Sequence, residues 1–229
     1  MKIHGLQKMT LLDYPGKVAC TVFLGGCDLR CPFCHNAELI DGTAPAVMDE
    51  EELMAFLKKR QGLLEGVAVT GGEPLLRGAE MIRLAERIRE LGYPLKLDTN
   101  GTHPETLREI IGRGLADYIA MDIKNAPERY AETCGLKEMD TGPVRESAAL
   151  LLEGRTEYEF RTTTVAELHD EDSFRGIGEW IRGAKRYYLQ KFTDRDTVPF
   201  GGFHAPADEA MERYLRIVRE YVPAAALRG

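Results

Sequence analysis

The chain has 229 residues, 44% of them hydrophobic and 29% charged, which is the balance of an ordinary globular domain with one full core. Its net charge of −7, without any cluster of Lys and Arg, argues against a nucleic-acid partner. No stretch approaches the roughly 20 apolar residues that span a bilayer, and residues 1–16 do not resemble a secretory signal, so we expect a single cytoplasmic domain over residues 1–229 with no membrane partner.

Short β-rich runs alternate along the chain with longer amphipathic stretches. The predicted strands are 18–24, 66–70, 94–99, 117–123, 157–164 and 186–191, and the predicted helices lie within 49–60, 81–91, 107–111, 144–152, 174–181 and 207–221. Strands that alternate with helices indicate βα units and a parallel sheet. Six such units predict an α/β fold, a partial (β/α)6 TIM-like barrel that is open on one side. Segments 41–46, 125–141 and 193–205 are predicted to be the most flexible.

Three cysteines stand within eight residues just after the first predicted strand: Cys27, Cys31 and Cys34, spaced C-x3-C-x2-C. Three thiolates on one short loop can hold three irons of a 4Fe–4S cluster. Ferredoxin-type clusters are normally closed by four cysteines, and no fourth lies nearby, so one iron would stay free to bind a ligand. A structural zinc site is the alternative, because zinc prefers four ligands and His35 or Cys20 could complete the set.

The chain has five cysteines, an odd number that suits a reducing compartment and metal binding better than a set of disulfides. Cys20 and Cys134 are left without a role, since free cysteines are most often small buried residues. Two spare thiols are too few for a second cluster, so we expect one.

Glycines and polar residues follow the second and third predicted strands, where βα barrels carry their functional residues. The second strand is followed by Gly71-Gly72-Glu73. The glycines permit a tight turn or the close approach of a ligand to the backbone, and the glutamate could accept hydrogen bonds from a ligand ammonium group. Asp98-Thr99-Asn100-Gly101, after the third strand, is by itself a turn signal.

Charged residues end the fourth and fifth strands. Asp122 and Lys124 share one side of the fourth strand, where they would form an ion pair or contact a charged ligand. Arg161 on the fifth strand could bind a carboxylate or a ribose through its planar guanidinium, or could simply be a polar strand end. Gln190 and His204 are given no role, and His204 is predicted to lie on the surface.

The loop from Cys27 to Cys34, with Phe33 before the last cysteine, carries the signature of the radical S-adenosylmethionine (radical SAM) enzymes. The ending Cys34-His35-Asn36 resembles a narrower group, the activating enzymes of glycyl radical proteins. The resemblance implies that the three cysteines bind one 4Fe–4S cluster and that Phe33 packs on the adenine of S-adenosylmethionine.

Three further segments resemble the cofactor site of this group. Glycine-glycine-glutamate after the second strand resembles the motif that holds the methionine amino group, and the Asp-Thr-Asn-Gly and Asp-x-Lys segments resemble those of pyruvate formate-lyase activating enzyme. In that relative two aspartates also help hold a monovalent cation, so the resemblance admits such a cation beside Asp98, Thr99 and Asp122. The implied cofactor-binding residues are Phe33, Gly71, Gly72, Glu73, Asp98, Thr99, Asn100, Asp122, Lys124 and Arg161.

The resemblance also implies a reaction and its partners. One electron from a flavodoxin- or ferredoxin-like donor would cleave S-adenosylmethionine to methionine and a 5′-deoxyadenosyl radical, which would take hydrogen from the Cα of a glycine in a glycyl radical protein. The overall likeness is to anaerobic ribonucleotide reductase activating proteins, although six strands fit the longer pyruvate formate-lyase activators. The partner protein therefore stays open.

Two alternatives remain. A radical SAM enzyme could act on a small molecule such as a deazapurine precursor, as in 7-carboxy-7-deazaguanine synthase-like enzymes, although these tend to follow the last cysteine with aspartate where this chain has His35-Asn36. The remote alternative is a non-catalytic zinc or redox-sensing module, which would leave the strand-end motifs without an explanation.

Overall fold

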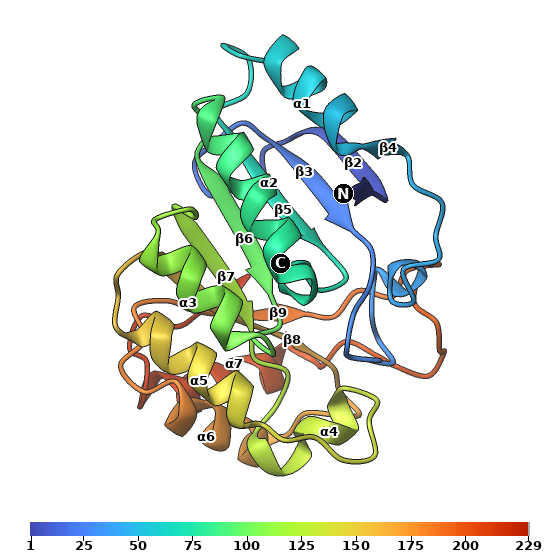
Figure 1. Ribbon diagram of the computed structural model, residues 1–229. Coiled ribbons are helices and arrows are strands. Elements are labelled where there is room, and N and C mark those ends of the chain that lie inside the picture. Colours follow the sequence, from blue (N-terminus) through green and yellow to red (C-terminus); the bar gives the residue numbers. More distant parts are fainter. Residues whose placement is uncertain (229) are drawn as a thin grey trace.

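An open eight-stranded sheet organises the protein, whose computed structural model describes residues 1–228 (Figure 1). The strand order is β10-β9-β8-β7-β6-β5-β3-β2. Six neighbouring strands are parallel: β3 (Ala19–Leu24), β5 (Gly66–Gly71), β6 (Leu95–Thr99), β7 (Tyr118–Asp122), β8 (Glu157–Thr164) and β9 (Tyr187–Lys191). They coincide with the six strands predicted from the sequence, so the partial TIM-like α/β barrel is confirmed.

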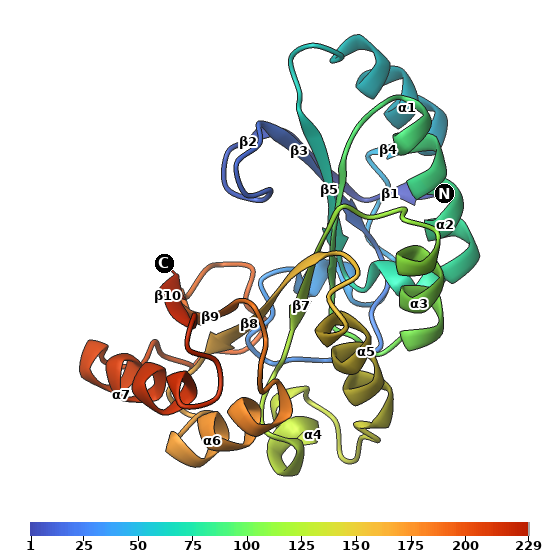
Figure 2. The ribbon, with the colours of Figure 1, turned by 90° about the vertical axis from the view of Figure 1, so that its left-hand side faces the viewer.

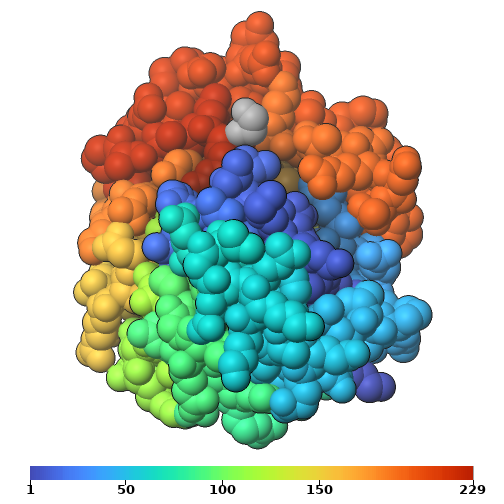
Figure 3. Space-filling view, turned by 90° about the horizontal axis from the view of Figure 1, so that it is seen from above, coloured from blue at the N-terminus to red at the C-terminus, as the bar shows by residue number. Residues whose placement is uncertain are grey.

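The two edges of the sheet hold strands that the sequence did not predict. β2 (Gly5–Thr10) pairs with β3 antiparallel, and β10 (Ala226–Arg228) pairs with β9 in parallel. β2 is mostly exposed and β10 is very short, so neither gives the period-two pattern of a half-buried strand. These edges do not pair with each other, which leaves the barrel open on one side (Figure 2). Tyr14 and Lys17, in the segment after β2, line the same surface pocket as Arg228 of β10, and seen from above this blue segment lies beside the red C-terminal part of the chain (Figure 3).

Six amphipathic helices cover the outer face of the sheet (Figures 1 and 2). α1 illustrates why they form: the Asp49 side chain caps its first turn by accepting from the Glu52 N–H at 2.9 Å, and Leu53 and Leu57 on one face are fully buried. The six are α1 (Glu50–Lys59), α2 (Gly78–Glu90), α3 (Pro104–Gly112), α5 (Gly142–Leu152), α6 (Glu171–Trp180) and α7 (Asp208–Arg219).

Four short elements and a small second sheet complete the connections. Three are 3-10 turns, and β1 pairs antiparallel with β4 apart from the main sheet. Their bounds are β1 (Lys2–Ile3), β4 (Met48–Asp49), η1 (Ala37–Leu39), η2 (Pro74–Arg77), η3 (Pro127–Arg129) and α4 (Tyr130–Thr133). None of the described helices combines the length and apolar character that crossing a bilayer requires.

Alternation along the strands places charged residues inside the barrel. On β6, Leu95 and Leu97 belong to the hydrophobic core, so Lys96 and Asp98 face the opposite side. Deeper in the barrel, the buried carboxylate of Glu159 accepts two hydrogen bonds from Arg228, at 2.6 and 2.8 Å. The interior is thus ionic rather than apolar, and this arrangement positions the charges of the site described below.

The prediction of a flexible, irregular segment at 125–141 is wrong for its first half. Residues 127–133 form η3 and α4, and Asn125, Tyr130 and Thr133 are fully buried. The Asn125 side-chain amide donates to the Thr133 hydroxyl at 2.8 Å and to the Leu168 carbonyl at 2.9 Å. A helix of one turn is too short to show a periodic pattern, which is why the sequence did not reveal it.

Candidate active site

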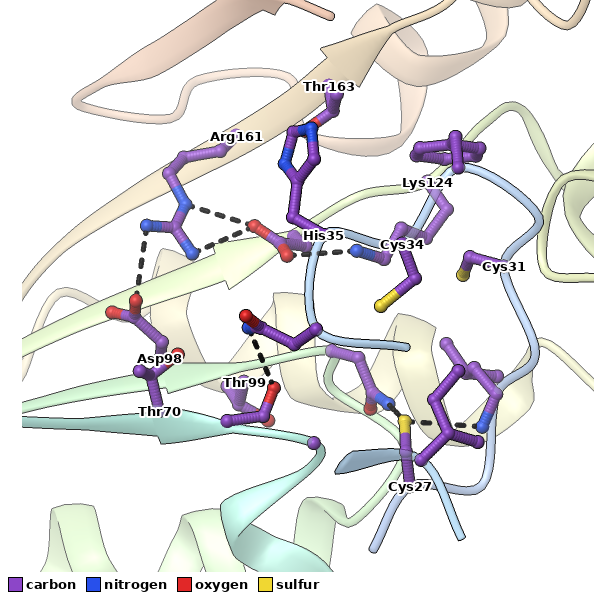
Figure 4. Close-up of a pocket in the computed structure, with 18 of the residues that line it drawn as sticks. Cys27, Cys31, Cys34, His35, Thr70, Asp98, Thr99, Lys124, Arg161 and Thr163 are labelled. Atoms are coloured by element: carbon purple, nitrogen blue, oxygen red, sulfur yellow. Dashed lines mark hydrogen bonds and ion pairs between the residues drawn. The ribbon is translucent and has the colours of Figure 1, made fainter. Parts of the chain in front are cut away.

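A cavity of about 230 Å³ opens at the carboxyl ends of the parallel strands (Figure 4). Its walls come from the cysteine loop, which we define as residues 25–36, and from the ends of β5 to β9. The structure therefore brings together side chains that are more than a hundred positions apart in the sequence. All the predicted site residues line it except Glu73: Cys27, Cys31, Phe33, Cys34, Gly71, Gly72, Asp98, Thr99, Asn100, Asp122, Lys124 and Arg161.

The three cysteines of the motif present free thiols to one side of this cavity (Figure 4). The Cys27 sulfur accepts a hydrogen bond from the Leu29 N–H at 3.4 Å and lies 3.8 Å from the side-chain amide of Asn100. Burial raises the pKa of the Cys27 thiol to about 12 and also raises that of Cys34. These two thiols therefore hold their protons more tightly than a free cysteine does, and binding of a metal would release them.

Cys134 touches the third thiol, a contact that sequence reasoning missed. A hydrogen bond from the Cys134 thiol, together with the nearby Lys124 ammonium, lowers the pKa of Cys31 below its ordinary value. The Arg30 N–H also donates to the Cys134 carbonyl at 2.9 Å, so α4 is fastened to the cysteine loop. Nothing in the spacing of the sequence signals this contact, because 100 residues separate the two segments.

The two residues that could have completed a zinc set, Cys20 and His35, have other surroundings, although His35 also lines the cavity. Cys20 is fully buried in the hydrophobic core. His35 stacks on Phe192 with ring centroids 5.6 Å apart, and its Nε2 donates to the Thr193 carbonyl at 2.7 Å. Within residues 1–228, no group of three or more His, Cys, Asp and Glu side chains is placed to hold a single metal ion such as zinc, whereas an iron–sulfur cluster takes only one cysteine per iron.

The glycine pair after β5 abuts the cysteine loop with no room for a side chain. A Cβ on Gly72 would lie 2.0 Å from the Gly26 carbonyl oxygen, and one on Gly71 would lie 2.2 Å from the Leu24 oxygen. Gly71 also has a φ of +124°, which favours glycine. The Asn36 side-chain amide donates to the Gly71 carbonyl at 3.2 Å, so a hydrogen bond as well as close packing holds the cysteine loop against the glycine pair.

Glu73 lies beneath the cavity and connects two strand ends. One carboxylate oxygen accepts from the Leu75 N–H at 2.9 Å and the Thr99 hydroxyl at 2.8 Å, and the other accepts from the Asn100 N–H at 2.6 Å. Burial raises the pKa of Glu73 to about 7 despite these bonds. The carboxylate therefore links the end of β5 to the end of β6 by hydrogen bonds and acts as a structural bracket between them. Its direct contact with an ammonium group stays a prediction.

Glu73→Gln is expected to lower the free energy of unfolding by about 1–3 kcal/mol, because the amide presents an N–H to one of the donors and leaves it unsatisfied. Folding raises the pKa of the parent carboxyl to about 7, so its contribution to stability is full below about pH 4 and is lost as the pH rises through 7. The difference in stability between parent and variant should accordingly be largest below about pH 4 and shrink between about pH 4 and about pH 7. Urea denaturation of the metal-free proteins measures it.

The matched control is Glu80→Gln on α2, whose partly exposed side chain forms, among residues 1–228, one ion pair, with Arg77 at 3.9 Å. This control should unfold like the parent. A Glu73→Gln variant as stable as the parent at every pH would show that the carboxylate is not a structural bracket.

Five charged side chains form what we call the charge network: Arg161, Asp98, Asp122 and Lys124 line the cavity, with Lys124 on the side nearest the cysteines (Figure 4), and Lys96 lies outside the lining. Arg161 lies 2.9 Å from Asp122 and 3.4 Å from Asp98, and Lys124 lies 2.9 Å from Asp122. Lys96 contacts Asp98 from below. Burial alone would raise the pKa of Asp122, but Arg161 and Lys124 hold it well below its usual range. The expected ion pair of Asp122 and Lys124 is therefore present, within a larger network.

The monovalent cation admitted by the sequence does not fit this arrangement. Both oxygens of Asp98 already face cations, as do both oxygens of Asp122. The Thr99 hydroxyl donates to Glu73 at 2.8 Å. Every expected ligand is thus engaged within the chain, and that part of the prediction is corrected.

Several lining residues were not assigned from the sequence: Leu29, His35, Asn36, Ile40, Thr70, Thr163 and Gln190. Thr163 could have been found, because it shares a face of β8 with Arg161. Phe192, just after the sixth predicted strand, could not be matched to a role from the sequence; it does not line the cavity, but Phe33 packs edge-on against it with ring centroids 6.4 Å apart. His204 is exposed and pairs with Glu167 at 2.7 Å, which confirms its surface position.

Comparisons with known proteins agree with this geometry. The family model of the Radical SAM superfamily matches residues 21–172. The protein MJ1227 of Methanocaldococcus jannaschii, whose name proposes a glycyl-radical enzyme activating enzyme, is 28% identical over 234 residues, which are 99% of this chain and 95% of that protein.

Two relatives that match over shorter segments are named for two different activities. The pyruvate formate-lyase-activating enzyme of Clostridium pasteurianum is 30% identical over 131 residues, 56% of this chain and 54% of the enzyme. The 7-carboxy-7-deazaguanine synthase of Thermococcus kodakarensis is 32% identical over 131 residues, 48% of this chain and 51% of the synthase. The chain thus spans about half of each of these two relatives.

A solved structure matches the fold over most of the chain. SuiB of Streptococcus suis, bound to S-adenosylmethionine, superposes with a TM-score of 0.69 over 91% of this chain and 52% of its own, at 13% identity. At this identity the likeness supports the partial barrel and nothing finer.

Proposed function

Because the chain belongs to the radical SAM superfamily, we propose that it is an activating enzyme that takes a hydrogen atom from a glycine of a partner glycyl radical protein, as anaerobic ribonucleotide reductase activators do. The likeness to MJ1227 runs the length of both chains and supports this choice. The one structural observation that carries the proposal is the cavity itself, which faces three free thiols toward a buried network of charges.

The family implies a 4Fe–4S cluster and S-adenosylmethionine, and the residues present fit both. Cys27, Cys31 and Cys34 are unpaired thiols on a single loop, and amide donors stand near the Cys27 sulfur, as second-shell donors do around metal-bound sulfur. We assign these three cysteines to three irons of the cluster. Bound together, the cluster and S-adenosylmethionine supply a one-electron cleavage that yields methionine and a 5′-deoxyadenosyl radical.

The other lining residues bind and orient the cofactor in this proposal. Gly71 and Gly72 leave backbone uncovered at the cavity wall, where an ammonium group can approach the carbonyl oxygens. Arg161 and Lys124 keep positive charge beside the place for a carboxylate. Phe33, fixed against Phe192, offers an aromatic edge to the adenine. The electron would come from a flavodoxin- or ferredoxin-like donor.

A second candidate function is favoured by the match to 7-carboxy-7-deazaguanine synthase. In that case the same chemistry would act on a small deazapurine precursor instead of a protein. The two candidate functions share the cofactor site and differ only in the substrate that enters the cavity. An experiment that identifies which substrate becomes a radical therefore distinguishes them.

The test is electron paramagnetic resonance after anaerobic mixing of the reconstituted protein, S-adenosylmethionine, a reductant and a candidate glycyl radical protein. We expect a doublet signal on the partner and 5′-deoxyadenosine in matching amount. A partner whose radical glycine is replaced by alanine should give no doublet. Absence of the doublet with every candidate, together with 5′-deoxyadenosine that depends on a deazapurine precursor, would favour the second function.

A further inference from the structure

Lys96 is a buried cation that the proposed chemistry leaves unused. It lies on β6 two residues before Asp98, and its side chain is only 3% exposed. Lysine is almost never buried so completely unless it is paired. Among residues 1–228 the ammonium contacts one carboxylate, that of Asp98, and Lys96 does not line the cavity. Any effect of Lys96 on the site must therefore pass through Asp98.

Asp98 carries this contact into the cavity wall. Its Oδ1 accepts from Lys96, and its Oδ2 lies 3.4 Å from Nη1 of Arg161. The charge network thus alternates in sign and holds three cations against two carboxylates, which leaves one positive charge in surplus. Without Lys96 the network would be neutral, and one oxygen of Asp98 would face a buried space without a donor.

We propose that Lys96 is a positioning residue whose ammonium supplies, within the chain, the positive charge that an alkali cation would otherwise bring to Asp98. It fixes Asp98 against Arg161 and keeps the network positive beside the place for a carboxylate. This inference rests on the proposed function, because it takes the carboxylate of S-adenosylmethionine as the group that the network serves. It follows that cofactor binding to this protein requires neither Na⁺ nor K⁺.

The first test uses the parent protein. S-adenosylmethionine binding to the reconstituted protein is measured by equilibrium dialysis in choline chloride and in potassium chloride of equal ionic strength. Because choline is too large to enter a buried cation site, we expect the two dissociation constants to agree within about twofold, which is less than the loss of one charged contact would cause. Binding that requires potassium or sodium would overturn the proposal.

The second test uses Lys96→Ala, which removes the ammonium and leaves room for a small cation. In choline the variant should bind S-adenosylmethionine about tenfold more weakly or worse, and potassium or ammonium chloride should restore most of the affinity. The matched control is Lys59→Ala at the exposed end of α1, which should behave like the parent in every salt. Equal binding by the Lys96 and Lys59 variants in choline would contradict the assignment.

A readout on the unloaded protein separates this proposal from the proposed function. Potassium should raise the melting temperature of Lys96→Ala above its value in choline, and should leave that of the parent unchanged. If the parent bound no S-adenosylmethionine in any buffer, the proposed function would fail, and this melting experiment would still decide on Lys96. A higher melting temperature of the parent in potassium than in choline, or an unchanged melting temperature of Lys96→Ala, would overturn the proposal on Lys96.

Discussion

Cys31→Ala is expected to lower the iron content of the anaerobically reconstituted protein from about four per chain to well below that value. Cys31 is the most buried of the three motif thiols, and the neighbouring Cys134 does not line the cavity, so we do not expect it to replace Cys31. Formation of 5′-deoxyadenosine should fall by at least about a hundredfold, since loss of a second-shell partner alone costs up to that factor. Iron analysis and product chromatography measure the two effects.

Cys20→Ala is the control, because Cys20 is also a buried core cysteine but does not line the cavity. It should keep its iron and its product formation. Undiminished formation of 5′-deoxyadenosine by Cys31→Ala would show that the three-cysteine loop does not take part in the reaction.

Gly72→Ala is expected to displace the cysteine loop. The new Cβ would meet the Gly26 carbonyl oxygen at 2.0 Å, a backbone atom that cannot rotate away. Overpacking of this kind destabilises a fold by about 1–3 kcal/mol, and the movement also separates the loop from the glycine pair. We therefore expect lower stability in urea and a cluster that is lost or assembles poorly, seen as reduced visible absorption after reconstitution.

Gly112→Ala is its matched control, since a Cβ at the end of α3 meets no atom within 4 Å. It should leave cluster absorption unchanged and leave stability equal or raise it by about 0.4–1 kcal/mol. If Gly72→Ala assembled the cluster as well as this control, the close approach at Gly26 would not matter for the site.

The parallel strands were predictable because each shows a clear hydrophobic pattern in the sequence. Each of β3, β5 and β6 is a buried run that ends at glycine or at polar residues, and the helices between them show one apolar face. The edge strand β2 was missed because it is mostly exposed, and α4 because a single turn has no period. What the sequence could not indicate was how each edge and each connection packs.

The membership of the site was also predictable, but not what each member touches. The rule that functional residues follow barrel strands placed Asp98, Asp122 and Arg161 in one cavity. Glu73 was expected to face a ligand, whereas three donors within the chain surround its carboxylate. Lys96 was overlooked and Cys134 was left without a role, because their importance depends on partners that only the folded chain brings near.

The most direct test of the proposed chemistry is the low-temperature electron paramagnetic resonance spectrum of the reduced, reconstituted protein before and after addition of S-adenosylmethionine. We predict the signal of one 4Fe–4S cluster, shifted by S-adenosylmethionine because in the proposed function the cofactor would bind the iron that no cysteine holds. A spectrum that S-adenosylmethionine leaves unchanged, or a colourless protein that retains zinc in place of iron, would contradict it.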